Sequence, residues 1–216
     1  KSLASFTIDR DREYILPLVK AALKATGERL VLFASPWSPP AFMKTTGSAL
    51  FGGKLSGEYM DTWAQCFVRY IQEFEKEGVA IWGVTVQNEP NAIQTWESCQ
   101  YSAQEEADFI KNHLAPALDK AGLSDVKIII WDHNKEQLYD RAKVTLADED
   151  VRRRVTGIGM HWYSGEHFEA VGITKQAFPE KQLLVTEFCH GLYAKERAVT
   201  MAERYAYDMI GNLMNG

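Results

Sequence analysis

The sequence predicts an α/β fold in which parallel strands alternate with helices. Short apolar runs recur along the chain, and each is followed by a longer segment whose apolar residues have helical spacing. The runs are nearly continuous in apolar residues and rich in branched side chains, which is typical of parallel strands buried on both faces. A repeated strand–helix order indicates a parallel sheet covered by helices.

Five segments fit this description of a buried strand. The expected strands are residues 30–35, 81–86, 126–131, 157–161 and 182–186. Together with one helix ahead of the first strand, they predict a helix followed by five strand–helix units.

The segments between the strands carry the signals of helix ends. Apolar residues between positions 63 and 74 have helical spacing, and Gly78 stands where a C-terminal cap is expected. Ser102 and Glu105 form a capping-box pattern at the start of the next helix, which Gly122 closes.

The first and last helices are each predicted from one apolar face. Residues 14–22 carry this face in the first helix, and Pro17 inside it predicts a kink or a broken start. The apolar face of the last helix consists of Val199, Ala202, Ala206, Met209 and Leu213.

Two architectures have this order of elements: an open doubly wound sheet and a (β/α)8 barrel. No Gly-rich phosphate loop follows any of the strands, which disfavours a nucleotide-binding doubly wound fold. Polar and aromatic clusters instead follow several strands at their C-terminal ends, where barrels build their active sites. We therefore predict a (β/α)8 TIM barrel. Five strands cannot close a barrel of eight, so residues 1–216 are expected to form a single, partial barrel domain.

The composition is that of an ordinary globular protein, with 46% hydrophobic and 25% charged residues and a formal net charge of −5. Acidic and basic residues are mixed, so we expect neither nucleic acid nor an anionic membrane as a partner. No apolar run is long enough for a transmembrane segment. Lys1 opens directly into polar sequence, so no targeting signal is expected in this segment, and the sequence leaves the compartment open.

The cysteine and histidine pattern predicts neither a disulfide framework nor a metal site. The three cysteines have no short spacing between them, and we expect free thiols. His161, His167, Cys189 and His190 lack the spacing of known metal sites. We therefore expect no metal site, and the two-carboxylate chemistry predicted below needs neither a metal nor an organic cofactor.

The first candidate catalytic residue is Glu89, in the cluster Gln87-Asn88-Glu89-Pro90 directly after the expected strand 81–86. A carboxylic acid at the C-terminal end of a strand can point into the mouth of a barrel. Pro90 is expected to hold Glu89 in an extended conformation. The amide of Asn88 can both donate to and accept from a sugar hydroxyl. The alternative is a strand end capped by polar loop groups.

The second candidate is Glu187, which directly follows the expected strand 182–186. Taken alone, it is equally well explained by a surface salt bridge. The pair carries more weight, because Glu89 and Glu187 end two strands with two strand–helix units between them and would face each other across a barrel mouth. Glycoside hydrolysis needs such a pair: one acid protonates the leaving oxygen, and the other attacks the anomeric carbon or activates water.

His161 and Tyr163 follow the strand that precedes Glu187. The Tyr163 hydroxyl is placed to hydrogen-bond the Glu187 carboxylate, and the alternative is a core aromatic residue with a solvated tip. The loop Ser35-Pro36-Trp37-Ser38-Pro39-Pro40 is rigid and presents Trp37 either as a platform for a sugar or as packing over the barrel rim.

The cluster Trp131-Asp132-His133-Asn134 also stands at a strand end. Its position suits a contact with substrate. The alternative is a helix N-cap formed by Asp132 or Asn134.

These residues resemble glycoside hydrolase family 30, the family that includes the glucosylceramidases. The resemblance covers almost the whole chain in the right order. The matching stretches are L-F-A-S-P-W-S-P-P-A-F-M-K, W-G-V-T-V-Q-N-E-P, I-I-I-W-D-H-N, G-M-H-W-Y and L-V-T-E-F. Asn-Glu-Pro alone would indicate only a wider clan of barrel hydrolases. The Ser-Pro-Trp loop and the His-Trp-Tyr sequence narrow the resemblance to this family.

The resemblance implies a role for each candidate residue. Glu89 matches the acid/base after the fourth barrel strand, Glu187 matches the nucleophile after the seventh, and Asn88 matches the residue that holds the sugar 2-hydroxyl. The remaining matches to substrate-binding positions are Trp37, Asn134, His161 and Tyr163.

The family pattern also contains parts with no counterpart among these residues, namely strands 1, 2 and 8 and a β-sandwich. The chain resembles strands 3 to 7 only. We expect the missing strands and sandwich to complete the site in a longer parent chain. We therefore expect the isolated segment to be inactive.

The predicted function is hydrolysis of a β-glycoside with retention of configuration. Glu187 attacks the anomeric carbon, and Glu89, kept protonated by a neighbouring negative charge and partial burial, donates to the leaving oxygen. The expected substrate is a carbohydrate or glycolipid, first of all a β-glucoside such as a glucosylceramide-like lipid or a β-1,6-glucan. Xylan or a β-xyloside is the alternative within the family, and a carbohydrate-binding barrel without catalysis is the alternative outside it.

Overall fold

The computed structural model of the chain describes residues 3–27, 29–190 and 198–216. Its centre is one parallel sheet in which the strand order follows the chain order, β1-β2-β3-β4-β5. Each strand therefore pairs with its neighbours in sequence, as in a barrel. The strands are β1 Phe33–Ala34, β2 Gly83–Thr85, β3 Lys127–Asn134, β4 Val155–His161 and β5 Gln182–Glu187.

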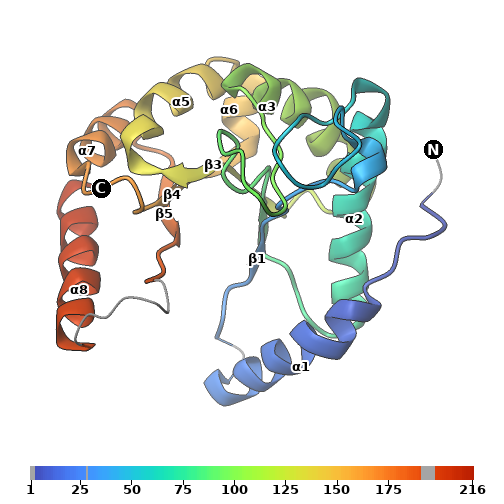
Figure 1. Cartoon of the computed structure of the whole chain (residues 1–216), viewed down its shortest axis with the longest axis horizontal. Helices are drawn as coiled ribbons and strands as arrows, with labels where there is room; N and C mark the ends of the chain where they lie inside the picture. The colour runs from blue at the N-terminus through green and yellow to red at the C-terminus, as the bar shows by residue number, and fades with distance from the viewer. Residues whose placement is uncertain (1–2, 28, 191–197) are drawn as a thin grey trace.

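Helices connect the strands and cover the outer side of the sheet. Figure 1 shows them in an arc that runs from α1 through α2, α3 and α5 to α7 and α8. The α-helices are α1 Asp9–Thr26, α2 Met60–Lys76, α3 Ala103–Phe109, α4 Ala115–Lys120, α5 Leu138–Thr145, α6 Glu149–Arg154, α7 Phe168–Ala177 and α8 Ala198–Asn215. Short 3-10 segments occur at Ala41–Met43, Gly57–Tyr59 and Lys135–Gln137, and a π-helical turn, η3, spans Ile110–Leu114 between α3 and α4.

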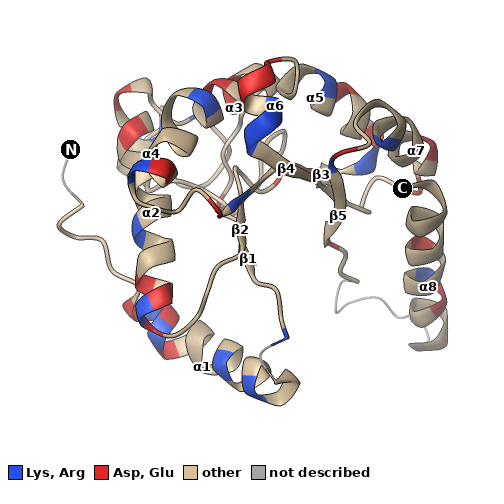
Figure 2. Cartoon of the chain, turned by 180° about the vertical axis from the view of Figure 1, so that it is seen from behind, with Lys and Arg blue, Asp and Glu red and all other residues tan. Residues whose placement is uncertain are grey.

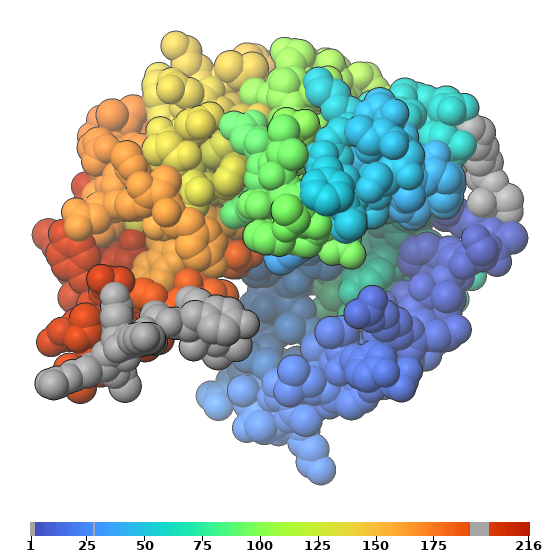
Figure 3. All heavy atoms as spheres, viewed as in Figure 1, coloured from blue at the N-terminus to red at the C-terminus, as the bar shows by residue number. Residues whose placement is uncertain are grey.

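The arc confirms the predicted partial barrel. Among the described residues, β1 and β5 each have a hydrogen-bonded neighbour on one side only, so the sheet is open at both edges. The space-filling view shows the molecule hollowed on the inner side of the arc, between its N-terminal and C-terminal segments (Figure 3).

Charged residues are distributed over the outer helices with both signs mixed, as Figure 2 shows. The buried interior is apolar and lies between the sheet and the helices, with the fully buried Ile128, Ile130 and Ile158 contributed by β3 and β4. None of the described helices has the length and apolar character needed to cross a membrane.

The predicted helix signals around the second and third helical segments are confirmed. Ser102 Oγ accepts from Glu105 N at 3.2 Å, and Glu105 Oε2 accepts from Ser102 N at 2.7 Å, which completes the capping box. Gly78 and Gly122 have φ of 78° and 75° just beyond α2 and α4, a left-handed conformation that glycine adopts without steric cost.

The predicted kink or broken start at Pro17 does not interrupt the helix: a broken start is wrong, because α1 runs through Pro17 as one helix from Asp9 to Thr26. Proline removes one backbone donor, but contacts along the helix hold it in place. Leu16 is buried, and Arg12 forms ion pairs with Glu73 in the last turn of α2 and with Glu77 directly after it.

The last helix packs through a different face from the predicted one. Val199, Met209 and Leu213 are exposed in α8, whereas Asp208 and Asn212 are buried. The reason is Lys135, a buried amine that needs polar partners: its Nζ donates to Asp208 and lies 3.3 Å from Asn212 Oδ1. A polar anchor at the end of β3 therefore fixes the orientation of α8.

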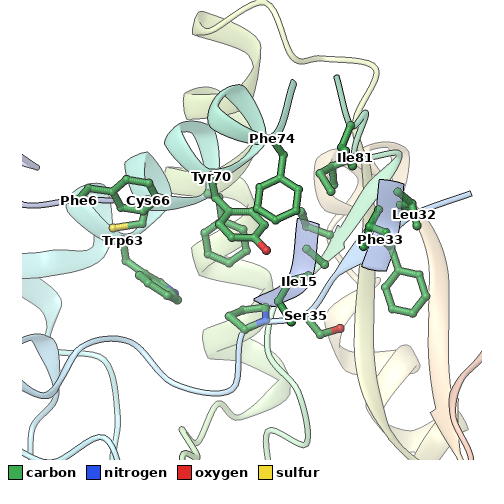
Figure 4. A pocket seen from close by; sticks show the side chains of 16 residues that line it. Phe6, Ile15, Leu32, Phe33, Ser35, Trp63, Cys66, Tyr70, Phe74 and Ile81 are labelled. Carbon is green, nitrogen blue, oxygen red and sulfur yellow. The ribbon is translucent and has the colours of Figure 1, made fainter. Parts of the chain in front are cut away.

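An apolar pocket lies near the β1 edge of the sheet, between α1, α2 and the first two strands (Figure 4). Phe6, Ile15, Tyr70 and Phe74 are among its lining residues, and neither candidate glutamate lines it. Its lining offers hydrocarbon and aromatic surface rather than a set of polar groups, so we place the candidate site elsewhere.

Candidate active site

The candidate residues gather at one edge of the sheet. Asn134, His161 and Glu187 are the last residues of β3, β4 and β5, and Glu89 follows β2 by four residues. Parallel strands end at the same edge, so these side chains share one face, as in the mouth of a barrel.

Glu89 is held by contacts with three neighbouring segments. Its Oε1 lies 3.2 Å from His161 Nδ1, its Oε2 accepts from Gln94 Nε2 at 3.4 Å, and its backbone N–H donates to Asp132 O at 2.9 Å. The side chain is 14% exposed. The carboxylate is thus mostly buried but still partly exposed, which suits a group that must meet a substrate.

The backbone of Glu89 differs from the predicted extended form. Its φ is 47°, in the left-handed region that non-glycine residues seldom adopt. Two backbone hydrogen bonds impose this turn: Glu89 N–H to Asp132 O, and Asn88 N–H to Pro36 O at 3.0 Å. Such strain costs about 1–3 kcal/mol and is concentrated in proteins at functional positions.

The pKa of Glu89 lies below its ordinary value, which is opposite to the expected direction. The hydrogen bond with His161 is the main cause, and it outweighs the opposing effect of partial burial. The neighbour with the largest effect on the pKa of Glu89 is therefore His161, a cation, rather than a negative charge.

His161 is buried, with a carboxylate at each ring nitrogen. Its Nδ1 faces Glu89, and its Nε2 lies 3.0 Å from Asp132 Oδ1. Burial would lower the pKa of His161, but the hydrogen bonds with Asp132 and Glu89 raise it to about 9. The site therefore contains an imidazolium at neutral pH.

Asp132 is not the helix cap that its position allowed. It is buried, and Ser35 Oγ donates to its Oδ2 at 2.9 Å. Thr85 Oγ1 in turn donates to Ser35 Oγ at 2.8 Å. Burial has the largest single effect and raises the pKa of Asp132, but the hydrogen bond and the charge of His161, together with hydrogen bonds to Thr186 and Thr85, lower this pKa by more in sum, so the net shift is downward. A chain of polar groups thus runs across the first four strands to His161.

A distortion of β3 aims Asp132 into this network. Trp131 and Asp132 have φ of 71° and 51°, and the register with β4 shifts between Trp131 and His133. Such a bulge redirects side chains at the rim of a barrel. Gly159 of β4 accommodates it, because a Cβ there would lie 3.1 Å from Asp132 Cα and 3.0 Å from Thr186 Oγ1.

Glu187 is half-buried and is tied to Tyr163 as predicted. The Tyr163 hydroxyl donates to Glu187 Oε1 at 2.9 Å and accepts from the backbone N–H of Cys189 at 3.0 Å. Desolvation and the carboxylate raise the pKa of Tyr163, so the hydroxyl stays protonated as a donor. Glu187 is also paired in register with His161 of β4.

A short chain of side chains links the two glutamates. His161 contacts Glu89, Tyr163 contacts Glu187, and the rings of His161 and Tyr163 meet edge to face with centroids 6.0 Å apart. The structure therefore brings the two predicted acids into one polar cluster, through two residues that the sequence also singled out.

Trp37 and Asn88 lie on the neighbouring loops. Trp37 is 43% exposed, and its carbonyl accepts from Gln87 Nε2 at 2.7 Å, while Asn88 is buried and bonded through its backbone to Pro36. The loops after β1 and β2 are thus hydrogen-bonded to each other next to Glu89 in the sequence.

Asn134 lies at the same edge, and its Oδ1 accepts from the backbone N–H of Tyr163 at 3.0 Å. The side chain therefore positions Tyr163.

Of the residues His161, His167, Cys189 and His190, the side chains of His167 and His190 are engaged outside the Glu89–His161 cluster. His167 Nε2 contacts the Ser164 carbonyl, and the ring of His190 packs against Trp162. A different set comes together within the described residues: single ligand atoms of Glu89, His133 and His161 lie within 4.8 Å of one another.

Sequence reasoning missed the residues behind the acids. Ser35 and Thr85 lie in the family-like stretches but were assigned no role, Gln94 carries no motif signal, and Asp132 was open to the N-cap interpretation. One signal for Asp132 was available in the sequence. It directly follows a buried apolar strand, as Glu89 and Glu187 do, and a carboxylate in that position suits the mouth of a barrel better than a helix cap.

Comparison with known proteins shows the family and the fold of the chain. The family model of the glycosyl hydrolase family 30 TIM-barrel domain matches residues 2–216. Lysosomal acid glucosylceramidase of Mus musculus is 31% identical over 98% of this chain and 44% of its own length. The crystal structure of SrfJ from Salmonella typhimurium superposes with a TM-score of 0.93, at 38% identity over 98% of this chain and 47% of that one. The endo-β1,6-glucanase BT3312 gives a TM-score of 0.89, at 31% identity over the whole of this chain and 50% of that one.

The chain spans about half the length of the relatives that it matches. It covers the strand–helix units that carry both glutamates, and the matched family domain is the barrel itself. The chain therefore belongs to glycosyl hydrolase family 30, and its five strands form part of the TIM barrel of that family.

Proposed function

We propose that the protein containing this chain hydrolyses a β-glycoside with retention of configuration, with Glu187 as nucleophile and Glu89 as acid/base. The observation that carries the proposal is the polar cluster in which His161 contacts Glu89 and Tyr163 contacts Glu187. Paired carboxylates in one barrel mouth suit the two-step hydrolysis of a glycosidic bond.

In the first step, the Glu187 carboxylate forms a bond to the anomeric carbon while the bond from that carbon to the leaving oxygen breaks. Glu89 gives the leaving oxygen its proton. The donation from the Tyr163 hydroxyl at 2.9 Å orients Glu187 for this attack. In the second step, Glu89 takes a proton from water, and the oxygen of that water displaces Glu187 from the sugar.

The proton for Glu89 has a source in the site. His161 Nδ1 lies 3.2 Å from Glu89 Oε1, and the imidazolium is the protonated partner in the free protein. When a bound sugar excludes water from His161 and Glu89, the ionised forms of both side chains lose their hydration and become less favourable. The proton then moves from His161 to Glu89, and the pair becomes neutral before the leaving oxygen is protonated.

The proposed substrate is a β-glucoside. The relatives that match the chain include a glucosylceramidase and an endo-β1,6-glucanase, so a glucosyl lipid and a β-1,6-glucan are the two substrates to test. Trp37 has an exposed indole on the loop that hydrogen-bonds to Gln87 and Asn88, and this indole offers a flat apolar face on which a pyranose ring can stack.

The isolated 216 residues are proposed to be inactive, since β1 and β5 leave the barrel open at the edges of the described sheet. The full-length protein should therefore be compared with the isolated chain. Turnover of an aryl β-glucoside, a glucosylceramide and a β-1,6-glucan should occur only with the full-length protein.

A Glu187→Gln variant of the full-length protein should lose turnover while it still binds sugar. Proton NMR of the first product should show the β-anomer ahead of mutarotation. Binding without cleavage by the unsubstituted protein would favour a carbohydrate-binding barrel instead, and an α-anomer as the first product would rule out retention.

A further inference from the structure

We infer that Glu89, His133 and His161 form a binding site for a zinc-like divalent transition metal ion, and that such an ion inhibits the enzyme. The three residues come from the loop after β2 and the ends of β3 and β4. Each presents one ligand atom, and the three atoms lie within 4.8 Å of one another. The inhibition rests on the proposed role of Glu89, whereas the binding of the ion does not.

The spacing of the ligand atoms fits a small tetrahedral ion. Atoms bound at about 2.0–2.1 Å in tetrahedral geometry lie roughly 3.3–3.4 Å from one another. Glu89 Oε1 lies 3.2 Å from His161 Nδ1 and 3.7 Å from His133 Nδ1. The two spacings from Glu89 are thus within a few tenths of an ångström of the tetrahedral value, and all three ligand atoms lie within 4.8 Å of one another, close enough for a single ion.

His133 gives the clearest sign that a ligand atom of the proposed metal site lacks a partner. Its Nδ1 is buried and has no hydrogen-bond partner. Its ring is fixed by the neighbouring Trp131 ring, with centroids 4.9 Å apart, and lies edge-on to His161. An unpaired buried nitrogen costs free energy that a metal–nitrogen bond would recover.

His161 already has the outer contact that metal-binding histidines use. Its Nε2 lies 3.0 Å from Asp132 Oδ1, and Asp132 is in turn held by Ser35. A carboxylate at the far nitrogen fixes the tautomer that leaves Nδ1 free as a ligand. The two carboxylates, Glu89 and Asp132, also balance the charge of a divalent ion.

The donor set decides the class of ion. Two imidazole nitrogens and one carboxylate, with a fourth position left open, favour Zn²⁺ and similar transition metals over Mg²⁺ or Ca²⁺, which prefer oxygen. On binding, the ion forms bonds to the three atoms, and the proton between His161 and Glu89 leaves to solvent. Glu89 then has no proton to give, and its Oε1 is occupied by the ion.

The test uses the full-length protein, first stripped with EDTA and then titrated with ZnCl2 during turnover of an aryl β-glucoside. Zinc should inhibit, and EDTA should restore the rate. His133→Asn should raise the half-inhibitory zinc concentration at least about tenfold, since even outer-shell changes cost metal sites 10–100-fold. His113→Asn is the matched control, because His113 is bonded to Asp61 at the surface and should leave inhibition unchanged.

A second readout is independent of turnover. Co²⁺ added to the stripped protein should give the visible absorption of a low-coordinate nitrogen–oxygen site, and this absorption should be lost in His133→Asn and in His133→Phe, which keeps an aromatic ring beside Trp131. Retained cobalt absorption, or unchanged zinc inhibition, in both folded variants would overturn the inference. A His133-dependent cobalt signal in a protein without glycosidase activity would keep the metal site and refute the proposed function instead.

Discussion

His161 Nε2 lies 3.0 Å from Oδ1 of the buried Asp132, and this contact determines which ring nitrogen faces Glu89. The same contact raises the pKa of His161, so the imidazole carries the proton that the acid/base residue needs. The protonation of His161 therefore depends on Asp132, a buried residue that touches neither the candidate nucleophile nor the solvent.

Asp132→Asn should lower the pKa of His161 below the value of about 9. The substitution removes a negative charge from a buried cation, so the protonated form loses stabilisation and the proton leaves at lower pH. NMR titration of the His161 ring in the full-length protein measures this directly. The turnover number should fall by at least about tenfold, because acid–base catalysis contributes 10²–10⁴-fold.

Asp119→Asn is the control for this charge change, since Asp119 is exposed and lies 3.7 Å from Arg154, away from the site. An unchanged His161 titration in Asp132→Asn would contradict the assigned contact.

Tyr163→Phe should reduce turnover by about tenfold while leaving the Michaelis constant within a factor of a few. The variant removes one hydrogen bond to the charged Glu187 carboxylate, and such bonds contribute about 1.5–3 kcal/mol. The matched control is Tyr207→Phe, which removes a hydroxyl bonded to the Glu166 carboxylate outside the site. Equal losses in the two variants would show that Tyr163 has no special role in orienting Glu187.

Gly159→Ala should destabilise the protein by about 1–3 kcal/mol, the range for an overpacked position. The new methyl group would lie 3.1 Å from Asp132 Cα and 3.0 Å from Thr186 Oγ1, so the bulge in β3 must shift. Thermal unfolding measures the loss of stability, and activity should fall more than stability alone explains. Gly57→Ala is the control, because its Cβ would meet nothing within 4 Å.

The parts that were predictable from the sequence are those set by local pattern. The strand order, the capping box at Ser102 and the two glutamates at strand ends all follow from residue type and spacing. Tyr163 was also predictable, since a phenol two residues beyond β4 can reach only the neighbouring strand ends.

The parts that were not predictable depend on contacts between distant segments. The left-handed turn at Glu89 is imposed by the Asp132 carbonyl, and the polar face of α8 is turned inward by Lys135. The pKa of Glu89 was expected in the wrong direction because the sequence does not show that His161 is its nearest charged neighbour. No local spacing predicts these pairs, because their members lie between 43 and 77 residues apart in the sequence.

The most direct test of the account is covalent trapping of the nucleophile. The full-length protein is incubated with a 2-deoxy-2-fluoro-β-glucoside that carries a good leaving group, and the labelled peptide is identified by mass spectrometry. We predict one sugar attached to Glu187, with no label in Glu187→Gln. A label on Glu89 or another residue, or normal turnover by Glu187→Gln, would contradict the assignment of Glu187 as the group that attacks the anomeric carbon.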